Sequence, residues 1–103
     1  MKEDKLPGLD PIIHSRIRLA IISILASTKE ADFTFLKDTI GTTDGNLSSH
    51  LSKLEAAGYV EIRKTFIEKK PRTTVSITET GKAEFSRYLK ALEEILHPDK
   101  DKS

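Results

Sequence analysis

Cysteine is absent from the 103 residues of this chain. Its absence excludes disulfides, thiolate metal sites and a cysteine nucleophile. Long apolar runs are also missing, since none approaches the roughly 20 residues of a membrane-spanning helix. The first eight residues, MKEDKLPG, mix charges and lack the apolar core of a signal peptide. The sequence therefore predicts a cytoplasmic protein that does not bind membranes.

A large excess of one charge is lacking as well. The chain has 17 basic and 16 acidic residues, which gives a net charge of +1 with neutral histidines. Basic residues nevertheless gather between residues 60 and 75, where five of them outnumber two acidic residues. A local basic segment in a near-neutral protein fits phosphate contacts at one place, and it fits an ordinary solvated hairpin equally well.

Length and composition predict a single small domain over residues 1–103, with loose polar ends at 1–8 and 97–103. Hydrophobic residues make up 37% of the chain and charged residues 32%, so we expect a globular core under a heavily charged surface. A domain of this size can build one core and has little spare volume for a ligand cavity. No cofactor is expected.

Hydrophobic periodicity predicts helix, short helix, longer helix, strand, strand and helix, in that order. The expected ranges are 11–27, 34–40, 43–57, 59–66, 73–77 and 79–96. Residues 28–32 are expected to form a polar connection, and residues 67–72 a basic turn longer than two residues. Two short helices joined by a tight turn and followed by a hairpin form the winged helix-turn-helix architecture, an α+β fold that is mainly α.

Capping residues indicate where these helices begin and end. Asp10 followed by Pro11 predicts the start of the first helix, and Thr34 is predicted to cap the second. Gly41 suits the left-handed position just past the end of a helix. The third helix must then begin within residues 42–44, all of which are capping residues.

The third helix has two contrasting faces. Leu47, Leu51 and Leu54 recur at helical spacing and must face the core. The opposite side carries small polar residues, although these are weak helix formers. A helix that enters the roughly 12 Å wide major groove needs such a face, because short side chains let its backbone approach the bases. The alternative is that these residues are simply solvated. The candidate DNA contacts are Thr42, Thr43, Gly45, Asn46, Ser48, Ser49, Ser52 and Lys53.

The predicted hairpin has a basic tip that Pro71 stiffens. Each cation there can neutralise one phosphate and make DNA binding salt-dependent. The alternative is a solvated edge hairpin whose charges only guard against aggregation. The candidate contacts in this wing are Arg63, Lys64, Lys69, Lys70 and Arg72.

Residues 44–60, DGNLSSHLSKLEAAGYV, resemble the recognition-helix signature of winged-helix transcriptional regulators. Residues 69–73, KKPRT, are similar to the wing of these regulators, and residues 77–81, ITETG, to the segment that follows it. The resemblance is to the MarR-like and ArsR-like superfamily, in its small single-domain branch, and covers about residues 9–96. It implies a homodimer on double-stranded DNA, with the third helix in the major groove and the wing on backbone or minor groove. Asp44 departs from this pattern, since many relatives carry a basic or neutral residue there.

Apolar residues on the first and last helices exceed what the small core can cover. An exposed patch of that size would be a liability on a monomer. The resemblance also implies that these two helices form most of a dimer interface. The expected interface residues are Ile13, Ile17, Ile21, Tyr88, Leu89, Leu92, Ile95 and Leu96. A small-molecule effector in the dimer cleft is compatible with this sequence.

No catalytic or metal-binding constellation stands out in the sequence. His14, His50 and His97 lie far apart without the spacing of metal ligands, so no metal is expected. Ser48, His50 and Asp44 share one helix and cannot converge as nucleophile, base and orienting acid, so no enzyme is expected. The alternative to a DNA-binding regulator is a winged-helix protein–protein assembly module, because fold alone does not fix function.

Overall fold

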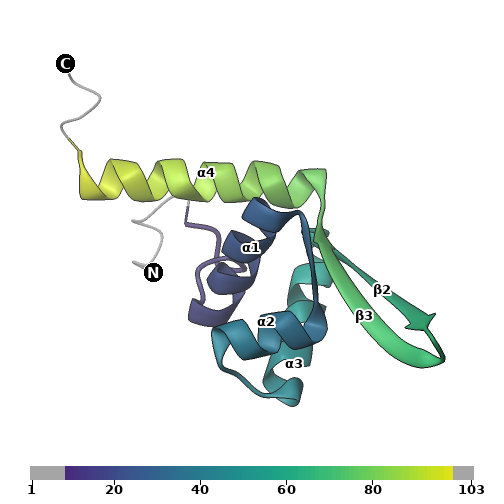
Figure 1. Cartoon of the computed structure of the whole chain (residues 1–103). Coiled ribbons are helices and arrows are strands. Elements are labelled where there is room, and N and C mark those ends of the chain that lie inside the picture. Colours follow the sequence, from purple (N-terminus) through teal and green to yellow (C-terminus); the bar gives the residue numbers. More distant parts are fainter. Residues whose placement is uncertain (1–8, 99–103) are drawn as a thin grey trace.

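A computed structural model describes residues 9–98 (Figure 1). In this range the elements are α1 Arg16–Thr28, β1 Glu30–Asp32, α2 Phe33–Ile40, α3 Asp44–Ala56, β2 Val60–Ile67, β3 Lys70–Ile77 and α4 Glu79–Leu96. The predicted winged-helix order is confirmed, with one short strand added between the first two helices. The predicted loose ends, 1–8 and 97–103, lie outside the described residues except for His97 and Pro98.

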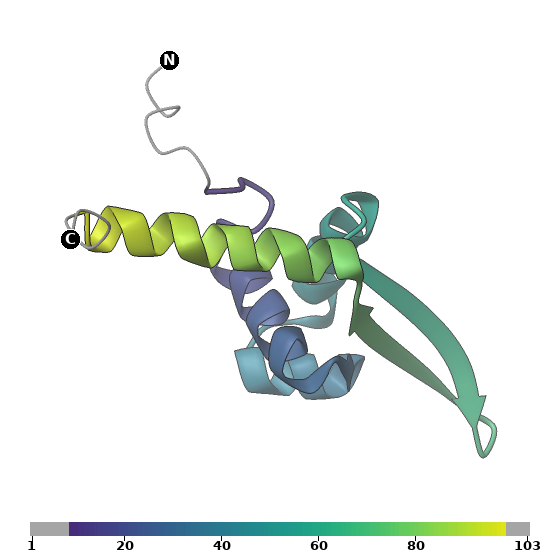
Figure 2. The ribbon, with the colours of Figure 1, turned by 90° about the horizontal axis from the view of Figure 1, so that it is seen from above.

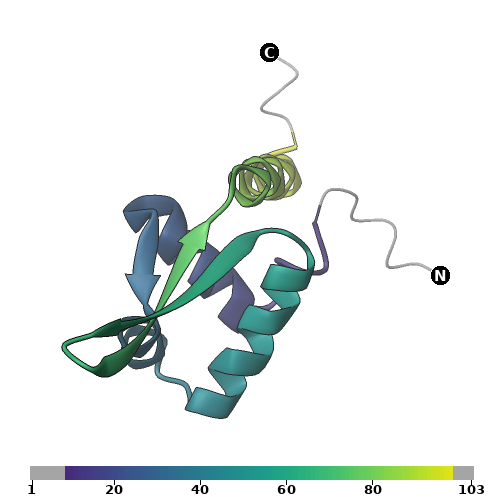
Figure 3. The same ribbon diagram turned by 90° about the vertical axis from the view of Figure 1, so that its right-hand side faces the viewer.

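Figure 1 shows α1, α2 and α3 gathered beneath α4, with the hairpin of β2 and β3 extending to one side. Figure 3 shows α4 end-on at one end of the molecule and the turn between α2 and α3 at the other. The tip of the hairpin and the start of α3 therefore both lie away from α4. No helix within residues 9–98 is both long and apolar enough to cross a membrane.

The three strands of the described chain form one antiparallel sheet in the order β1-β3-β2. β1 pairs with the inner half of β3. β2 pairs with β3 along its whole length, from Val60 opposite Ile77 to Ile67 opposite Lys70. The expected polar connection at residues 28–32 is therefore wrong in part, because pairing with the distant β3 makes its last three residues a strand.

Glu68 and Lys69 alone join β2 to β3, so the expectation of a longer turn at residues 67–72 is wrong. The second strand also starts three residues before its predicted range. Both turn residues have positive φ, 52° and 68°, as the tightest hairpin turns require. Neither is the glycine or asparagine that usually signals such a turn. Pro71 pairs with Phe66 beyond the end of β1, where an edge of β3 is free and tolerates the missing N–H.

Two predicted helix starts are wrong. α1 begins at Arg16 rather than Pro11, with Ser15 as its N-cap, whose hydroxyl accepts a backbone N–H of the first turn at 3.4 Å. α2 begins at Phe33, before the predicted cap Thr34, and follows β1 directly. Capping propensity alone misplaces both starts, because the preceding turn or strand sets where each helix can begin.

Asp10 closes a turn ahead of α1 instead of capping the helix. One carboxylate oxygen accepts the backbone N–H of Ile12 at 2.8 Å, and the other accepts the hydroxyl of Tyr59. Burial and this hydrogen bond raise the pKa of the Tyr59 hydroxyl, so it remains a donor. This hydrogen bond links the segment before α1 to Tyr59, the residue that precedes β2.

The core contains side chains from every described helix and from β2 and β3. α1 lies at its centre, in contact with α2, α3, α4 and the sheet. Each fully buried aliphatic side chain contributes roughly 1.5–3 kcal/mol relative to exposure. The buried residues are Ile13, Ile21, Ile22, Leu25, Leu36, Leu47, Leu51, Leu54, Tyr59, Val60, Val75, Ile77 and Tyr88.

The junction between the sheet and α4 is closely packed. Thr78 caps α4 by accepting the N–H of Gly81 at 2.9 Å, and its hydroxyl donates to the Gly58 carbonyl at 2.6 Å. Gly81 is buried, and a Cβ there would collide with the carbonyl oxygen of Tyr59 and come within 3.0 Å of Cγ1 of Ile77. Only glycine lets α4 start this close to the chain that enters β2.

We expect Gly81→Ala to lower the free energy of unfolding by about 1–3 kcal/mol, because the backbone must move to admit the methyl group. Gly45→Ala is the matched control, since a Cβ on this helical glycine meets no atom within 4 Å. It should raise the free energy of unfolding by up to about 1 kcal/mol through helix propensity. Urea titrations followed by circular dichroism measure both changes. Equal stability of Gly81→Ala and the wild type would contradict the close approach.

Candidate nucleic-acid interface

Three leucines hold α3 against the core and fix which side of the helix faces solvent. Leu47, Leu51 and Leu54 are at most 2% exposed. The remaining length of α3 is open to solvent over small polar side chains. Of the predicted contacts, Thr42 is half-buried and the exposed ones are Thr43, Gly45, Asn46, Ser48, Ser49, Ser52 and Lys53. The backbone of α3 is thus accessible to a partner along one side.

The start of α3 is a well-formed helix N-terminus. Gly41 ends α2 in the left-handed conformation, with φ 78°, and its N–H donates to the Lys37 carbonyl at 2.9 Å. Thr43 is the N-cap, and its hydroxyl accepts the N–H of Asn46 at 3.1 Å. Among the three candidate caps, Thr43 is therefore the one used. Free N–H groups and the positive end of the helix dipole at such a terminus suit a phosphate oxygen.

Asp44, the residue that departs from the regulator pattern, forms an ion pair across the helix-turn-helix. Its carboxylate lies 3.0 Å from Nζ of Lys37 on α2. The hydrogen bond and the charge of Asp44 raise the pKa of Lys37, so the ammonium stays charged. An exposed pair like this adds little stability. It does partly neutralise the carboxylate beside the exposed face of α3.

His50 links the flank of α3 to α1. Nη1 of Arg18 lies 2.9 Å from Nδ1 of His50, and Nε of Arg18 donates to the Ile12 carbonyl at 2.6 Å. Burial first, then the charges of Arg18 and Lys53, lower the pKa of His50. The ring is therefore a neutral acceptor that positions α3. In the described chain no three histidine, aspartate or glutamate side chains come together as a metal site.

We call the β2–β3 hairpin, residues 60–77, the wing. Its five predicted cations fall into two groups. Arg63 pairs with Glu30 and Arg72 with Asp32, both at 3.4 Å, so the two arginines are tied to β1. The three lysines are exposed and form no ion pair within residues 9–98. These unpaired cations are Lys64, Lys69 and Lys70.

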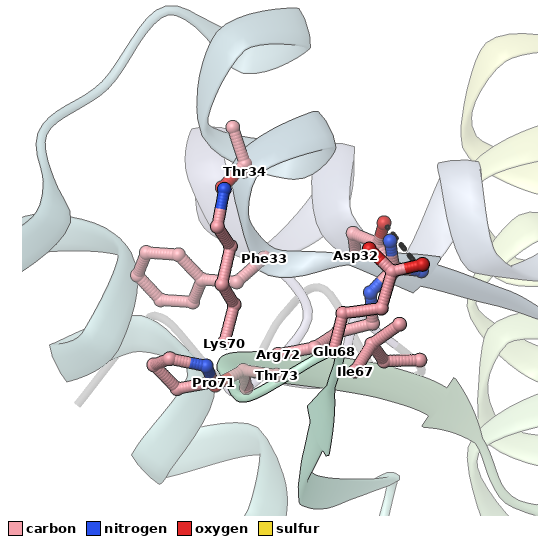
Figure 4. Close-up of a pocket in the computed structure, with 9 residues that line it drawn as sticks. All are labelled: Asp32, Phe33, Thr34, Ile67, Glu68, Lys70, Pro71, Arg72 and Thr73. Carbon is pink, nitrogen blue, oxygen red and sulfur yellow. Dashed lines mark ion pairs between the residues drawn. The ribbon is translucent and has the colours of Figure 1, made fainter.

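Two open hollows flank the wing. One, of about 670 Å³, lies between the wing and α3, and Ser48, Ser52 and Lys64 are among its lining residues. The other, of about 590 Å³, lies beside the tip (Figure 4). Figure 4 shows the Arg72–Asp32 pair across it and Lys70 extending toward Thr34 at the start of α2. The polar side of α3 and the wing thus border the first hollow, and the tip of the wing borders the second.

The predicted dimer residues separate into buried and exposed groups. Ile13, Ile21 and Tyr88 are at most 2% exposed within the single chain, so their side chains serve its own core. Ile17 and Leu92 are half-buried. The exposed side chains, at 41–62%, are Leu89, Ile95 and Leu96 on the last turns of α4.

Tyr88 joins α4 to the segment before α1. Its hydroxyl lies 2.8 Å from Nδ1 of His14. Burial raises the pKa of the Tyr88 hydroxyl. Tyr88 was expected at the dimer surface, but in this chain it is buried and contacts His14. A helical stripe of apolar residues does not by itself show which of them face the chain's own core.

Comparison with known proteins gives a consistent result. Residues 17–96 match the family model described as winged helix DNA-binding domain. An uncharacterized protein of Methanocaldococcus jannaschii, MJ0432, is 37% identical over 78 residues, which span 76% of this chain and 85% of that protein. The structure of a transcriptional regulator homologue from Pyrococcus horikoshii OT3 is 33% identical, with a TM-score of 0.84, over 97% of this chain and 99% of that one.

A more distant structure has the same fold. The homodimeric winged helix-turn-helix DNA-binding domain of Mb0332 from Mycobacterium bovis, described as a possible ArsR-family regulator, is 22% identical to this chain. The TM-score is 0.70, over 93% of this chain and 85% of that one.

We expect the stability of the protein to fall as the pH drops below about 6.5, the ordinary pKa of histidine. The pKa of His50 is lower in the folded chain, so the unfolded state takes up the proton first. Neutral His50 thus contributes its full share of stability above about pH 6.5. This contribution is lost as the pH falls toward the lower pKa that His50 has in the folded protein. Urea titrations between about pH 7.5 and 5.5 should show a smaller loss for His50→Gln, whose amide can accept from Arg18 without titrating. Equal pH dependence in both proteins would contradict this role.

Proposed function

Because this chain belongs to the family of winged-helix DNA-binding domains, we propose that it is a transcriptional regulator that binds duplex DNA as a homodimer. α3 is the recognition helix and lies in the major groove, while the wing contacts backbone or minor groove. The chain acts as one domain, by binding rather than catalysis. A cytoplasmic location, where it meets chromosomal DNA, is part of this proposal.

One observation carries the proposal: the exposed side of α3 is short and polar next to a wing with three unpaired lysines. Short side chains let the helix backbone enter the groove, and the lysines supply the phosphate contacts. Asn46, Ser48 and Ser49 are the candidate base readers. Asparagine suits adenine by a bidentate pair, whereas serine discriminates poorly. Shape and backbone contacts must therefore supply much of the specificity.

The homodimer rests on the far half of α4. Figure 2 shows this helix extending past the rest of the described fold. Leu89, Ile95 and Leu96 are exposed there and do not pack on the core. A second copy that covered them would also present a second α3 to the next half-site, about one helical turn away. The Mycobacterium bovis neighbour is described as homodimeric, which supports the proposal of a homodimer.

Replacing Lys69 and Lys70 together by alanine should weaken binding to every duplex alike. Because each lysine neutralises one phosphate, the slope of log affinity against log salt should become shallower by about 2 per subunit. Fluorescence anisotropy across a salt series measures both quantities. Lys90→Ala is the control, since Lys90 is also an exposed lysine but lies on α4. If the wild type binds no duplex at low salt, the regulator proposal fails and the assembly-module alternative gains.

A charge placed on the α4 surface should separate the subunits. Leu89→Glu introduces one charge from each subunit into the proposed interface. We expect the dissociation constant of the dimer to rise by roughly a hundredfold or more, since the proposed interface loses one covered leucine from each subunit. Sedimentation equilibrium measures the change, with Lys90→Glu on the neighbouring residue as control and circular dichroism to verify folding. A wild type that is monomeric at micromolar concentration would contradict the dimer.

A further inference from the structure

The tip of the wing carries apolar side chains that the fold does not use. Phe66 is 75% exposed, more than any other large hydrophobic residue in the described chain, and Ile67 beside it is 49% exposed. Neither packs against the core. Phe66 pairs across the strands with Pro71, so two apolar side chains stand together at the end of the hairpin. Single exposed apolar residues are ordinary, whereas this cluster is framed by the three unpaired lysines.

The strand geometry shows which way Phe66 points. Side chains alternate along β2, so Ile62, Lys64 and Phe66 share one face and Ile67 lies on the other. Ile62 and Lys64 line the hollow that the wing shares with Ser48 and Ser52 of α3. Phe66 therefore extends this same face outward to the tip. It stands on the side of the wing that a partner held by α3 would meet.

The hairpin holds Phe66 in a defined position although no core lies beneath it. Every residue of β2 is paired with β3, and a turn of only two residues closes the tip. The outer half of β2, from Arg63 to Ile67, is exposed throughout. Figure 2 shows this part of the hairpin extending away from the helices. The ring of Phe66 at its end is therefore exposed and can contact a partner.

We propose that Phe66 is an apolar wedge that enters the minor groove of bound DNA and partly separates two stacked base pairs, which kinks the duplex. The occupant is DNA because Lys64, Lys69 and Lys70 outnumber the single acidic residue of the tip, Glu68, and their positive charges can neutralise neighbouring phosphates. Proteins that bind the minor groove insert phenylalanine, leucine, isoleucine, methionine or proline in this way. Pro71 is the residue opposite Phe66 on the paired strand. The inference rests on the proposed function.

The wedge would add sequence preference that α3 does not supply. Pyrimidine–purine steps such as TA and CA unstack most readily, whereas A-tracts are stiff. Insertion of Phe66 therefore favours sites with a flexible step beneath the wing, although the ring makes no hydrogen bond to a base edge. This suits a recognition helix whose serines discriminate weakly.

The test measures bending and affinity on the same DNA. The full chain selects a duplex of about 30 base pairs from a random pool, and dyes on its two ends report the bend by energy transfer. Wild type should shorten the end-to-end distance, as a kink of about 20–90° requires. Phe66→Ala should bind about tenfold more weakly with little bend, at an unchanged salt slope because every lysine remains. Phe66→Leu should keep most of the bend.

Ile67→Ala is the matched control, because Ile67 sits at the same tip on the opposite face, and it should bend DNA like the wild type. Equal bending by Phe66→Ala and the wild type overturns the wedge, and so does a wild type that binds without bending. A Phe66→Ala variant that changes only the sedimentation behaviour also overturns it, since the ring would then contact protein. Failure of the wild type to retain any duplex at low salt overturns the regulator proposal itself, which separates the two failures.

Discussion

The burial of Leu47, Leu51 and Leu54 is the constraint on which the rest of the structure depends. These side chains fix the rotation of α3, because turning the helix by one residue, about 100°, would expose leucine and bury serine. Their packing also offsets the poor helix propensity of the stretch that contains Gly45 and Ser49. The solvent-facing polar side of α3 follows from this one anchored stripe.

Local patterns predicted the parts of the fold that depend on near neighbours. The leucine spacing of α3, the left-handed Gly41 and the last helix at residues 79–96 are all present in the structure. The strand β1 was missed because its three residues can form strand hydrogen bonds only when β3, which lies far along the chain, is beside them. The tight turn at the wing tip was missed because its two residues adopt positive φ without the usual glycine or asparagine.

The candidate site shows the same division. Sequence reasoning could place small polar residues on the outer side of α3 from their spacing alone. It could not find Lys37 as the partner of Asp44, or Arg18 as the partner of His50, because both contacts depend on the angle between two helices. Nor could it separate the wing arginines from the lysines. In the sequence the five basic residues of the wing look alike. In the structure, the pairing of β1 with β3 brings two acidic side chains within reach of the arginines only.

That unequal use of the wing cations has a consequence for how such a protein would search a chromosome. Attraction to arbitrary DNA is sequence-independent and grows with each cation free to displace a counterion. Arg63 and Arg72 already have carboxylate partners in their own sheet, and the net charge of the chain is only +1. If the chain is the regulator proposed above, random sequence would hold it weakly. More of its copies would then remain unbound at any moment, and the rare correct site would compete against a smaller genomic background.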